Sequence, residues 1–182
     1  MNEVNAIKSK TDLERVEAFI TKHYSEVISD AWKFGLQVSL RVSDLLALKF
    51  SDINNGVLTV KAQKTSKSIQ IRLNSKALEI VERRKTYGHT YLFQSTSNRA
   101  KSIDKPITRQ SLSKALQEAS NVINTAINTH SMRKTWGYFQ YRNTNNIALV
   151  QKALQHSSTA HTLRYIGIDQ DELDDAFTCL EL

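Results

Sequence analysis

The sequence is poor in the residues that cross-link or interrupt a chain. It contains one cysteine, Cys179, one proline, Pro106, and five glycines among 182 residues. A single thiol excludes an intrachain disulfide and a zinc site built from several cysteines, and it agrees with a reducing cytoplasm. Because helix breakers are so few, we expect helix to dominate the fold.

Long apolar segments are also missing. No run approaches the roughly 20 apolar residues of a membrane-spanning helix, and residues 1–10 lack the apolar stretch of a secretory signal. We therefore expect a cytoplasmic protein without a membrane partner. The length suits one compact domain, which we expect residues 1–182 to form.

Charge is unevenly placed along the chain. Lysine and arginine number 25 against 18 acids, and six of those acids follow Tyr165, where no lysine or arginine occurs. Residues 1–165 thus carry 25 bases and 12 acids, a net charge of +13. Such a basic body favours a polyanionic partner through counterion release, although charge alone fits a solvated surface equally well.

Apolar periodicity and capping residues predict helices arranged around a β-hairpin. A capping box at Thr11–Glu14 predicts the start of a first helix ending near residue 25, and Ser43 is the expected N-cap of a short third helix. Other helices are predicted at about 26–38, 74–88, 108–121, 130–141, 146–154, 158–166 and 171–180, strands at 57–60 and 69–73, and an extended piece at 91–93. The expected fold is mainly α with a small antiparallel β-sheet (α+β).

Four segments carry residues suited to phosphate chemistry. His130 and Arg133 lie three residues apart on one helix face, where the arginine fork matches two phosphate oxygens and the histidine can move a proton. The second segment contains Arg41 and Asp44, and Asp44 could pair with Arg41. The third is the hairpin loop with Lys61, Lys64 and Lys67, and the fourth contains His156, His161 and Tyr165. Taken alone, each of the four segments also fits an ordinary surface or core segment.

Taken together and in order, these segments resemble the tyrosine recombinase (phage integrase) family. LRVSDLLALKFSDI looks like the family's first arginine box, THSMRKTWGY like its His-x-x-Arg box, and LQHSSTAHTLRYIG like its closing His-to-Tyr segment. The nine-residue step from His156 to Tyr165 also fits. The resemblance covers about residues 11 to 167, the catalytic domain.

The resemblance implies a site-specific DNA recombinase that cleaves and rejoins strands through a 3′-phosphotyrosyl intermediate on Tyr165. Arg41, Arg133 and His156 would bind the phosphate, Lys64 would protonate the leaving 5′-oxygen, and His130 would assist proton transfer at the tyrosine. Lys64 is preferred over Lys61 and Lys67 because the family's lysine falls at the end of the first hairpin strand. Asp44 would support Arg41. The resemblance implies neither a metal nor another cofactor.

The partners implied are double-stranded DNA, further copies of the chain in a tetramer on paired sites, and accessory DNA-bending proteins, in a prokaryotic cytoplasm. Lysines and arginines around residues 99–114 are candidates for phosphate contacts. The acidic amphipathic tail, residues 168–182, could dock on a neighbouring protomer or on its own domain. Two alternatives remain: a type IB topoisomerase-like enzyme, and a catalytically inert DNA-binding or regulatory protein.

The sequence departs from the family pattern at several positions. Ser39 and Gln155 stand where glycine is frequent, and Lys134 stands where histidine is frequent. A turn with positive φ at position 39 would be mildly strained by serine. The separate N-terminal DNA-binding domain of most members is not expected here, which fits either a naturally short recombinase or an excised domain.

Overall fold

The structure, a computed structural model, describes residues 4–61, 68–95, 104–168 and 178. Its first half contains α1 (Lys10–His23), α2 (Glu26–Val38), α3 (Val42–Leu46), the 3-10 turn η1 (Phe50–Asp52), and strands β1 (Ile53–Asn54), β2 (Val57–Lys61) and β3 (Ser68–Arg72). Its second half contains α4 (Ser75–Lys85), α5 (Arg109–Ile123), α6 (Ser131–Thr144), α7 (Ile147–Ala153) and α8 (Thr159–Ile166). No helix in these described ranges is long and apolar enough to cross a membrane.

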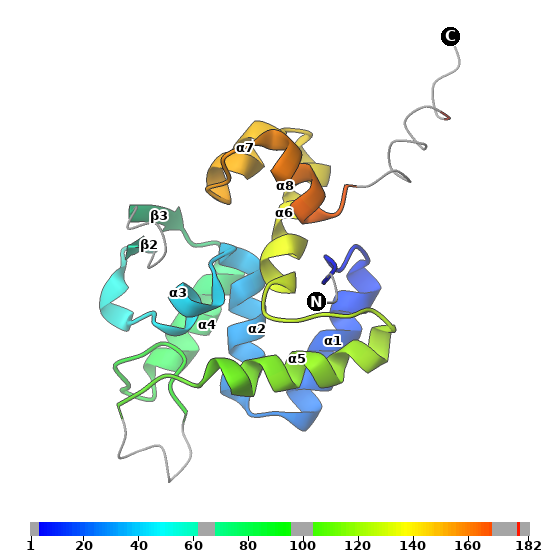
Figure 1. Ribbon diagram of the computed structural model, residues 1–182. Helices are drawn as coiled ribbons and strands as arrows, with labels where there is room; N and C mark the ends of the chain where they lie inside the picture. The colour runs from blue at the N-terminus through cyan, green and yellow to red at the C-terminus, as the bar shows by residue number, and fades with distance from the viewer. Residues whose placement is uncertain (1–3, 62–67, 96–103, 169–177, 179–182) are drawn as a thin grey trace.

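Helix α2 is the centre of the larger hydrophobic core. It packs against α1, α4, α5 and α6 (Figure 1). Trp32 and Phe34 are completely buried on it, and Phe34 meets Phe93 edge to face with ring centroids 5.6 Å apart. A helix that is apolar on almost every side must be surrounded in this way, because burial of its side chains is the main stabilising contribution.

A second, smaller cluster joins α6, α7 and α8 to the N-terminal segment. Ala6, Tyr138, Val150, Leu154 and Ile166 form its buried part. A Cβ at Gly137 would lie 2.7 Å from Ile166 Cγ2, so only glycine at this position lets α8 approach α6 so closely. The N-terminal segment is fixed there by Ile7 N–H, which donates to Thr135 Oγ1 at 2.8 Å. Residues far apart in sequence thus hold α8 in place.

The sheet is antiparallel with strand order β1-β2-β3. Val57 pairs with Arg72 and Lys61 with Ser68, so the β2–β3 register matches the predicted hairpin. On β3, Ile69 and Ile71 are half-buried between exposed neighbours, which confirms the expected alternation. The two-residue strand β1 was not predicted. It is too short to show any periodicity of its own.

Most predicted helices are confirmed, and three details are corrected. Ser9, and not Thr11, caps α1, because Ser9 is extended and its Oγ accepts the Asp12 N–H at 3.3 Å. Arg41, and not Ser43, is the N-cap of α3. Residues 91–93 form a turn bounded by isolated bridges at Tyr91 and Gln94, because Arg84 donates to the carbonyls of Leu92 and Gln94. The predicted helix at 171–180 lies outside the described residues, apart from Thr178.

Two left-handed turns occur at the positions where the family often has glycine. Ser39 ends α2 with φ 56°, and Gln155 follows α7 with φ 52°. The strain expected at Ser39 is therefore present, and Gln155 shares it. Ser39 Oγ is also buried without a hydrogen-bond partner among the described residues.

Candidate active site

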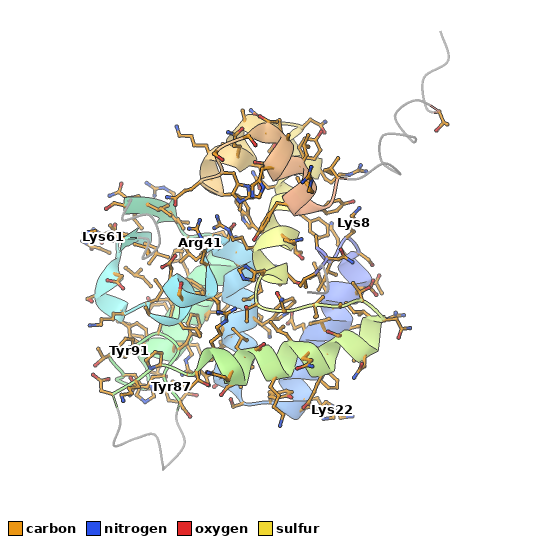
Figure 2. The ribbon with its side chains drawn as sticks, in the orientation of Figure 1. Lys8, Lys22, Arg41, Lys61, Tyr87 and Tyr91 are labelled. Atoms are coloured by element: carbon orange, nitrogen blue, oxygen red, sulfur yellow. The ribbon has the colours of Figure 1, made fainter. Side chains whose placement is uncertain are left out.

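Four of the predicted side chains converge where α2, α6 and α8 approach one another. Arg41 follows the left-handed turn after α2, and Arg133 lies in the first turn of α6. His156 precedes α8, and Tyr165 lies near the end of that helix. Figure 2 labels Arg41 near the junction of α2 and α3.

Arg133 is the buried anchor of this site, with 4% of its surface exposed. Its two terminal nitrogens donate to the carbonyl oxygens of Ser39 and Leu154. Burial lowers the pKa of Arg133, while the hydroxyl of Tyr165 and the carboxylate of Asp44 raise it. An arginine fixed by backbone acceptors is already oriented before a phosphate arrives.

The two carbonyls that orient Arg133 lie at the two strained turns. Ser39 itself has positive φ, and Leu154 directly precedes Gln155, which also has positive φ. At each turn the carbonyl oxygen points towards the guanidinium of Arg133 and not along the helix axis. Strained backbone persists where the surrounding structure holds it, and here it is held by the arginine.

Tyr165 is half-buried, and opposing effects act on its hydroxyl. Burial raises the pKa of Tyr165, whereas the charge of Arg133, its hydrogen bond and the charge of Arg41 lower it. The charges of two guanidinium groups therefore favour the ionised hydroxyl against the effect of burial. A phenol in this position can be ionised when a bound phosphate requires a nucleophile.

His156 lies against the tyrosine ring, with centroids 4.8 Å apart and planes at 82°. Its Nδ1 is 3.2 Å from Thr162 Oγ1, and that hydroxyl donates its only proton to Ser158 O at 2.9 Å. Nδ1 must then be the donor, which leaves Nε2 free to accept. Burial, Arg133, His161 and Arg41 together lower the pKa of His156 to about 4.

His130 is the N-cap residue of α6, three residues before Arg133. Its backbone N–H donates to Asn128 Oδ1 at 2.7 Å. Neighbouring protein atoms remove part of the ring's hydration and lower the pKa of His130, and the charges of Arg109, Arg133, Lys134 and Arg41 lower it further. The imidazole is therefore neutral at neutral pH, which is the form that has a nitrogen able to accept a proton.

The charge of Arg41 acts on the pKa of each of the other four residues of the site, His130, Arg133, His156 and Tyr165. Asp44 is almost fully buried on α3, and its charge favours the protonated form of Arg133. The predicted pairing of Asp44 with Arg41 stays a prediction.

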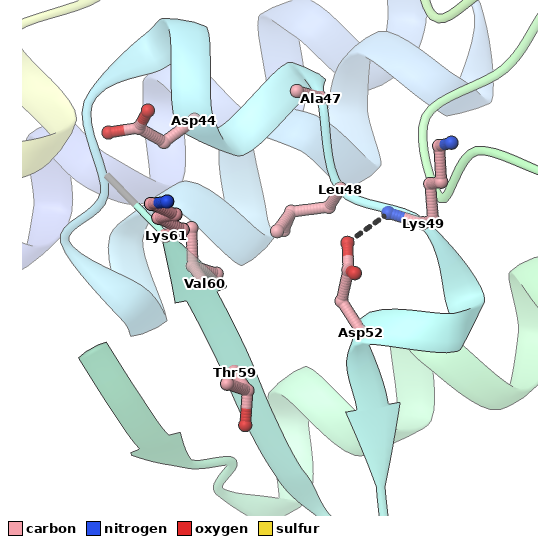
Figure 3. Close-up of a pocket in the computed structure, with 8 residues that line it drawn as sticks. All are labelled: Asp44, Ala47, Leu48, Lys49, Asp52, Thr59, Val60 and Lys61. Carbon is pink, nitrogen blue, oxygen red and sulfur yellow. Dashed lines mark hydrogen bonds between the residues drawn. The ribbon is translucent and has the colours of Figure 1, made fainter. Parts of the chain in front are cut away.

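Lys64 lies outside the described residues, as does Lys67. The structure follows β2 only to Lys61, which lines a pocket with Asp44, Lys49 and Asp52 (Figure 3). In this pocket the Lys49 N–H donates to Asp52 Oδ2 at 2.8 Å. The hairpin strand that leads to Lys64 therefore ends beside α3, the helix that directly follows Arg41.

Three further basic side chains adjoin the site without having been given a catalytic role from the sequence. Lys134 Nζ lies 5.3 Å from the centroid of the Tyr165 ring. The His161 ring is 4.7 Å from that of His156, and the charge of Arg109 acts on His130. The four-residue step from His161 to Tyr165 was a visible signal, because it places both residues on one helix face.

Within the described ranges, no three His, Cys, Asp or Glu side chains are grouped so that they could hold a metal ion. A hollow of about 820 Å³ does lie next to the site, between β3 and the α7–α8 connection. Ser68, Gln70, Lys152 and His156 are among the residues that line it.

The chain is similar to known proteins in sequence and in fold. The sequence is 41% identical over 142 residues to the probable integrase/recombinase YoeC of Bacillus subtilis (strain 168), which covers 76% of each chain. The fold matches the lambda integrase catalytic core with a TM-score of 0.68 and 18% identity, covering 84% of this chain and 91% of that one. It also matches XerA recombinase with a TM-score of 0.73 and 18% identity, covering 97% and 65%.

Longer solved chains are matched over only part of their length. The chain covers 61% of a lambda integrase fragment bound to a core site and 54% of XerH recombinase bound to its substrate, at 18% and 20% identity and a TM-score of 0.71 for both. It thus spans little more than half of these DNA-bound proteins. The sequence itself matches the phage integrase family over residues 10–172. This chain therefore belongs to the phage integrase family.

Proposed function

We propose that this chain is the catalytic domain of a site-specific DNA recombinase that cleaves and rejoins strands through Tyr165. The observation that carries the proposal is the placement of Tyr165 within one protomer: its ring lies 4.8 Å from that of His156, and the charges of Arg133 and Arg41 act on its hydroxyl. A nucleophile and two phosphate-binding cations thus share one site. The sequence relationship to a probable integrase/recombinase supports the same reaction.

The reaction balances without an external energy source. The Tyr165 oxygen attacks phosphorus, the bond from phosphorus to the 5′-oxygen breaks, and a 3′-phosphotyrosyl ester and a free 5′-hydroxyl result. Arg41 and Arg133 bind the non-bridging oxygens and stabilise the charge of the transition state. Rejoining is the reverse attack by a 5′-hydroxyl, which releases the tyrosine.

We assign the two proton transfers of the reaction to His130 and Lys64. The pKa of His130 is lowered, so that it is neutral at neutral pH and able to accept the phenol proton. We assign protonation of the leaving 5′-oxygen to Lys64, on the loop that continues β2. His156 is assigned to the phosphate, to which it would donate through Nε2 once a bound anion favours its protonated form. These assignments require no metal ion.

The partners follow from the reaction. We propose that the chain acts on double-stranded DNA as a tetramer on paired sites in a prokaryotic cytoplasm, with accessory proteins that bend the DNA. Lambda integrase has been solved as a dimer on a core site and as a tetramer on a Holliday junction. We further propose that the tail after Ile168 docks on a neighbouring protomer. If a chain ending at Ile168 assembles on DNA unchanged in gel filtration, the docking proposal is wrong.

The decisive test is trapping of the covalent adduct. Incubation with a nicked suicide substrate should give a protein–DNA adduct on a denaturing gel, and Tyr165→Phe should abolish it. Arg133→Ala and Arg41→Ala should each slow cleavage by about 100-fold or more, as expected for loss of a transition-state donor, while DNA affinity changes far less. An adduct that survives Tyr165→Phe would contradict the mechanism.

If no adduct forms with any plausible site, the inert DNA-binding alternative is favoured instead. A topoisomerase-like enzyme would form the adduct and relax supercoiled DNA without exchanging strands between two sites. Assay of both products with the same protein separates the two enzymes.

Lys134, which directly follows Arg133, lies 5.3 Å from the Tyr165 ring within the same protomer. This proximity predicts cleavage in cis, with each tyrosine attacking the phosphate held by its own protomer. Mixing Arg133→Ala protein with Tyr165→Phe protein tests this assignment. Cis cleavage predicts that the mixture stays inactive, because neither chain carries both groups. Recovery of activity in the mixture would show that the tyrosine acts in trans.

A further inference from the structure

Lys134 lies over the face of the Tyr165 ring, with Nζ 5.3 Å from its centroid. This distance is inside the limit of about 6 Å for a cation–π interaction. We propose that Lys134 is a positioning residue for Tyr165: its ammonium group holds the phenol ring in the orientation that directs the hydroxyl to Arg133. The inference rests on the proposed function of Tyr165 and adds a residue to its machinery.

The helix that carries Tyr165 gives little positional control by itself. Helix α8 has eight residues, and only Thr162 and Ile166 are buried on it. It ends at Gly167, two residues after the tyrosine, with φ 80°. A side chain so close to the end of a short helix depends on contacts from other elements for its orientation.

Lys134 supplies such a contact from α6, directly after Arg133. The ring then has a neighbour from each of two segments, since Lys134 on α6 lies over it and the His156 ring before α8 meets it at 82°. The charge of Arg133 acts on its hydroxyl. Lys134 and Arg133 are consecutive on one helix, so the cation over the ring and the proposed phosphate-binding group come from the same helical turn.

The interaction is compatible with both states of the tyrosine. Attack changes the bonding of the phenol oxygen, whereas the electron-rich face of the ring remains in the phosphotyrosyl ester. A cation over that face can hold the ring during cleavage and during the reverse attack. By contrast, a lysine that only bound DNA phosphate would affect DNA affinity and leave the chemical step unchanged.

The first experiment compares Lys134→Met and Lys134→Arg with Lys49→Met as the matched control. Lys49 Nζ also lies 5.3 Å from a tyrosine ring, that of Tyr91, which has no catalytic role. Single-turnover cleavage is measured with suicide substrate at saturating DNA. We expect Lys134→Met to slow cleavage by about 3- to 30-fold, the range of one cation–π contact, and Lys134→Arg to restore most of the rate.

DNA affinity and thermal unfolding are measured for the same variants. We expect Lys134→Met to weaken DNA binding no more than Lys49→Met does, because each removes one positive charge. If the cleavage rate of Lys134→Met equals that of Lys49→Met, or if its whole defect lies in DNA affinity, the inference is overturned.

A second experiment tests the contact itself by placing ring-fluorinated tyrosine at position 165. Fluorine withdraws electron density from the ring face and weakens a cation–π contact, and it also makes the phenol more acidic. The change in acidity is common to proteins with lysine and with methionine at position 134, so it cancels in a double-mutant comparison. We expect fluorination to slow cleavage about 2- to 10-fold more when Lys134 is present; equal effects in both proteins overturn the inference.

Failure of the proposed function gives a different result. If the unmodified protein forms no adduct with any substrate, both the recombinase proposal and the role of Lys134 are rejected. If the unmodified protein forms the adduct and Lys134→Met cleaves at the control rate, only the role of Lys134 is rejected.

Discussion

At the scale of single residues, the active site combines cations with groups that burial keeps neutral. Arg41 and Arg133 act on every titratable partner around them, and their charge opposes protonation of His130 and His156. The same charges favour ionisation of Tyr165 against the effect of burial. The site therefore holds His130, His156 and Tyr165 in their neutral forms, next to the cations that we propose bind the phosphate.

His156 makes this balance measurable. The folded protein holds the pKa of His156 at about 4, whereas an unfolded chain protonates a histidine near 6.5. Between these values the unfolded state binds more protons, so the free energy of unfolding falls as pH decreases from 6.5 towards 4. This group contributes at most about 1.4 kcal/mol per pH unit.

Urea unfolding at several pH values measures this dependence. His156→Asn should unfold with a shallower pH dependence than the unmodified protein, and the difference should disappear above about pH 7. The lowered pKa values of His89 and His130 act in the same direction, and both residues are retained in the variant. Identical pH slopes for the two proteins would contradict the assignment. In complex with DNA, NMR titration should show a higher pKa for His156, because phosphate favours the imidazolium.

At the scale of elements, the turns after α2 and α7 orient Arg133 and lower the stability of the fold. Their left-handed residues, Ser39 and Gln155, direct the chain so that the carbonyls of Ser39 and Leu154 meet Arg133. Other described left-handed positions at helix ends carry asparagine or glycine, as at Asn124, Asn145 and Gly167. Those residues tolerate this conformation, whereas serine and glutamine are strained in it.

Ser39→Gly should therefore stabilise the protein by about 1 kcal/mol, since it relieves the left-handed strain and removes a buried hydroxyl without a partner. Urea unfolding measures the gain, and cleavage should be retained because the carbonyl stays in place. Asn145→Gly is the matched control and should gain only a few tenths of a kcal/mol. A Ser39→Gly protein that is less stable than the unmodified chain would show that the serine side chain contributes packing instead.

At the scale of the whole molecule, basic charge is spread over the folded body, and the acids of the last segment follow Tyr165. Arg41, Lys61 and Lys8 illustrate how widely the cations are distributed in Figure 2. A nucleic acid that binds such a surface displaces condensed counterions, and the number displaced reports the phosphates contacted. Charge at this scale governs affinity, while the site governs chemistry.

We expect the logarithm of the DNA association constant to fall with the logarithm of salt concentration with a slope of about −4 or steeper, as for five or more phosphate contacts. Fluorescence anisotropy with labelled duplex DNA measures it. Tyr165→Phe removes no charge and should leave the slope unchanged, which makes it a suitable control. A slope near zero would mean that the basic surface does not contact the DNA backbone.

Much of the secondary structure of this protein follows from its local sequence. Helix α2 was predicted with its observed ends, Glu26 and Val38, and the predicted helices at about 74–88, 108–121 and 158–166 begin at the observed N-caps Asn74, Thr108 and Ser158. Short-range hydrogen bonds and apolar periodicity determine such features, and both are present within a few residues. The order of the motifs also identified the family, although not the distances between their side chains.

Tertiary structure alone decided how the motifs become a site. Arg133 is fixed by carbonyls of residues 39 and 154, which are distant from it in the chain, and no local pattern predicts such partners. Lys134 lies over the Tyr165 ring because α8 packs on α6 beside Gly137, and its proposed positioning role depends on that packing. The sequence by itself determined the family and predicted the nucleophile. The packing of distant segments decided which groups hold that nucleophile and in which direction it points, because burial and contact depend on the whole fold.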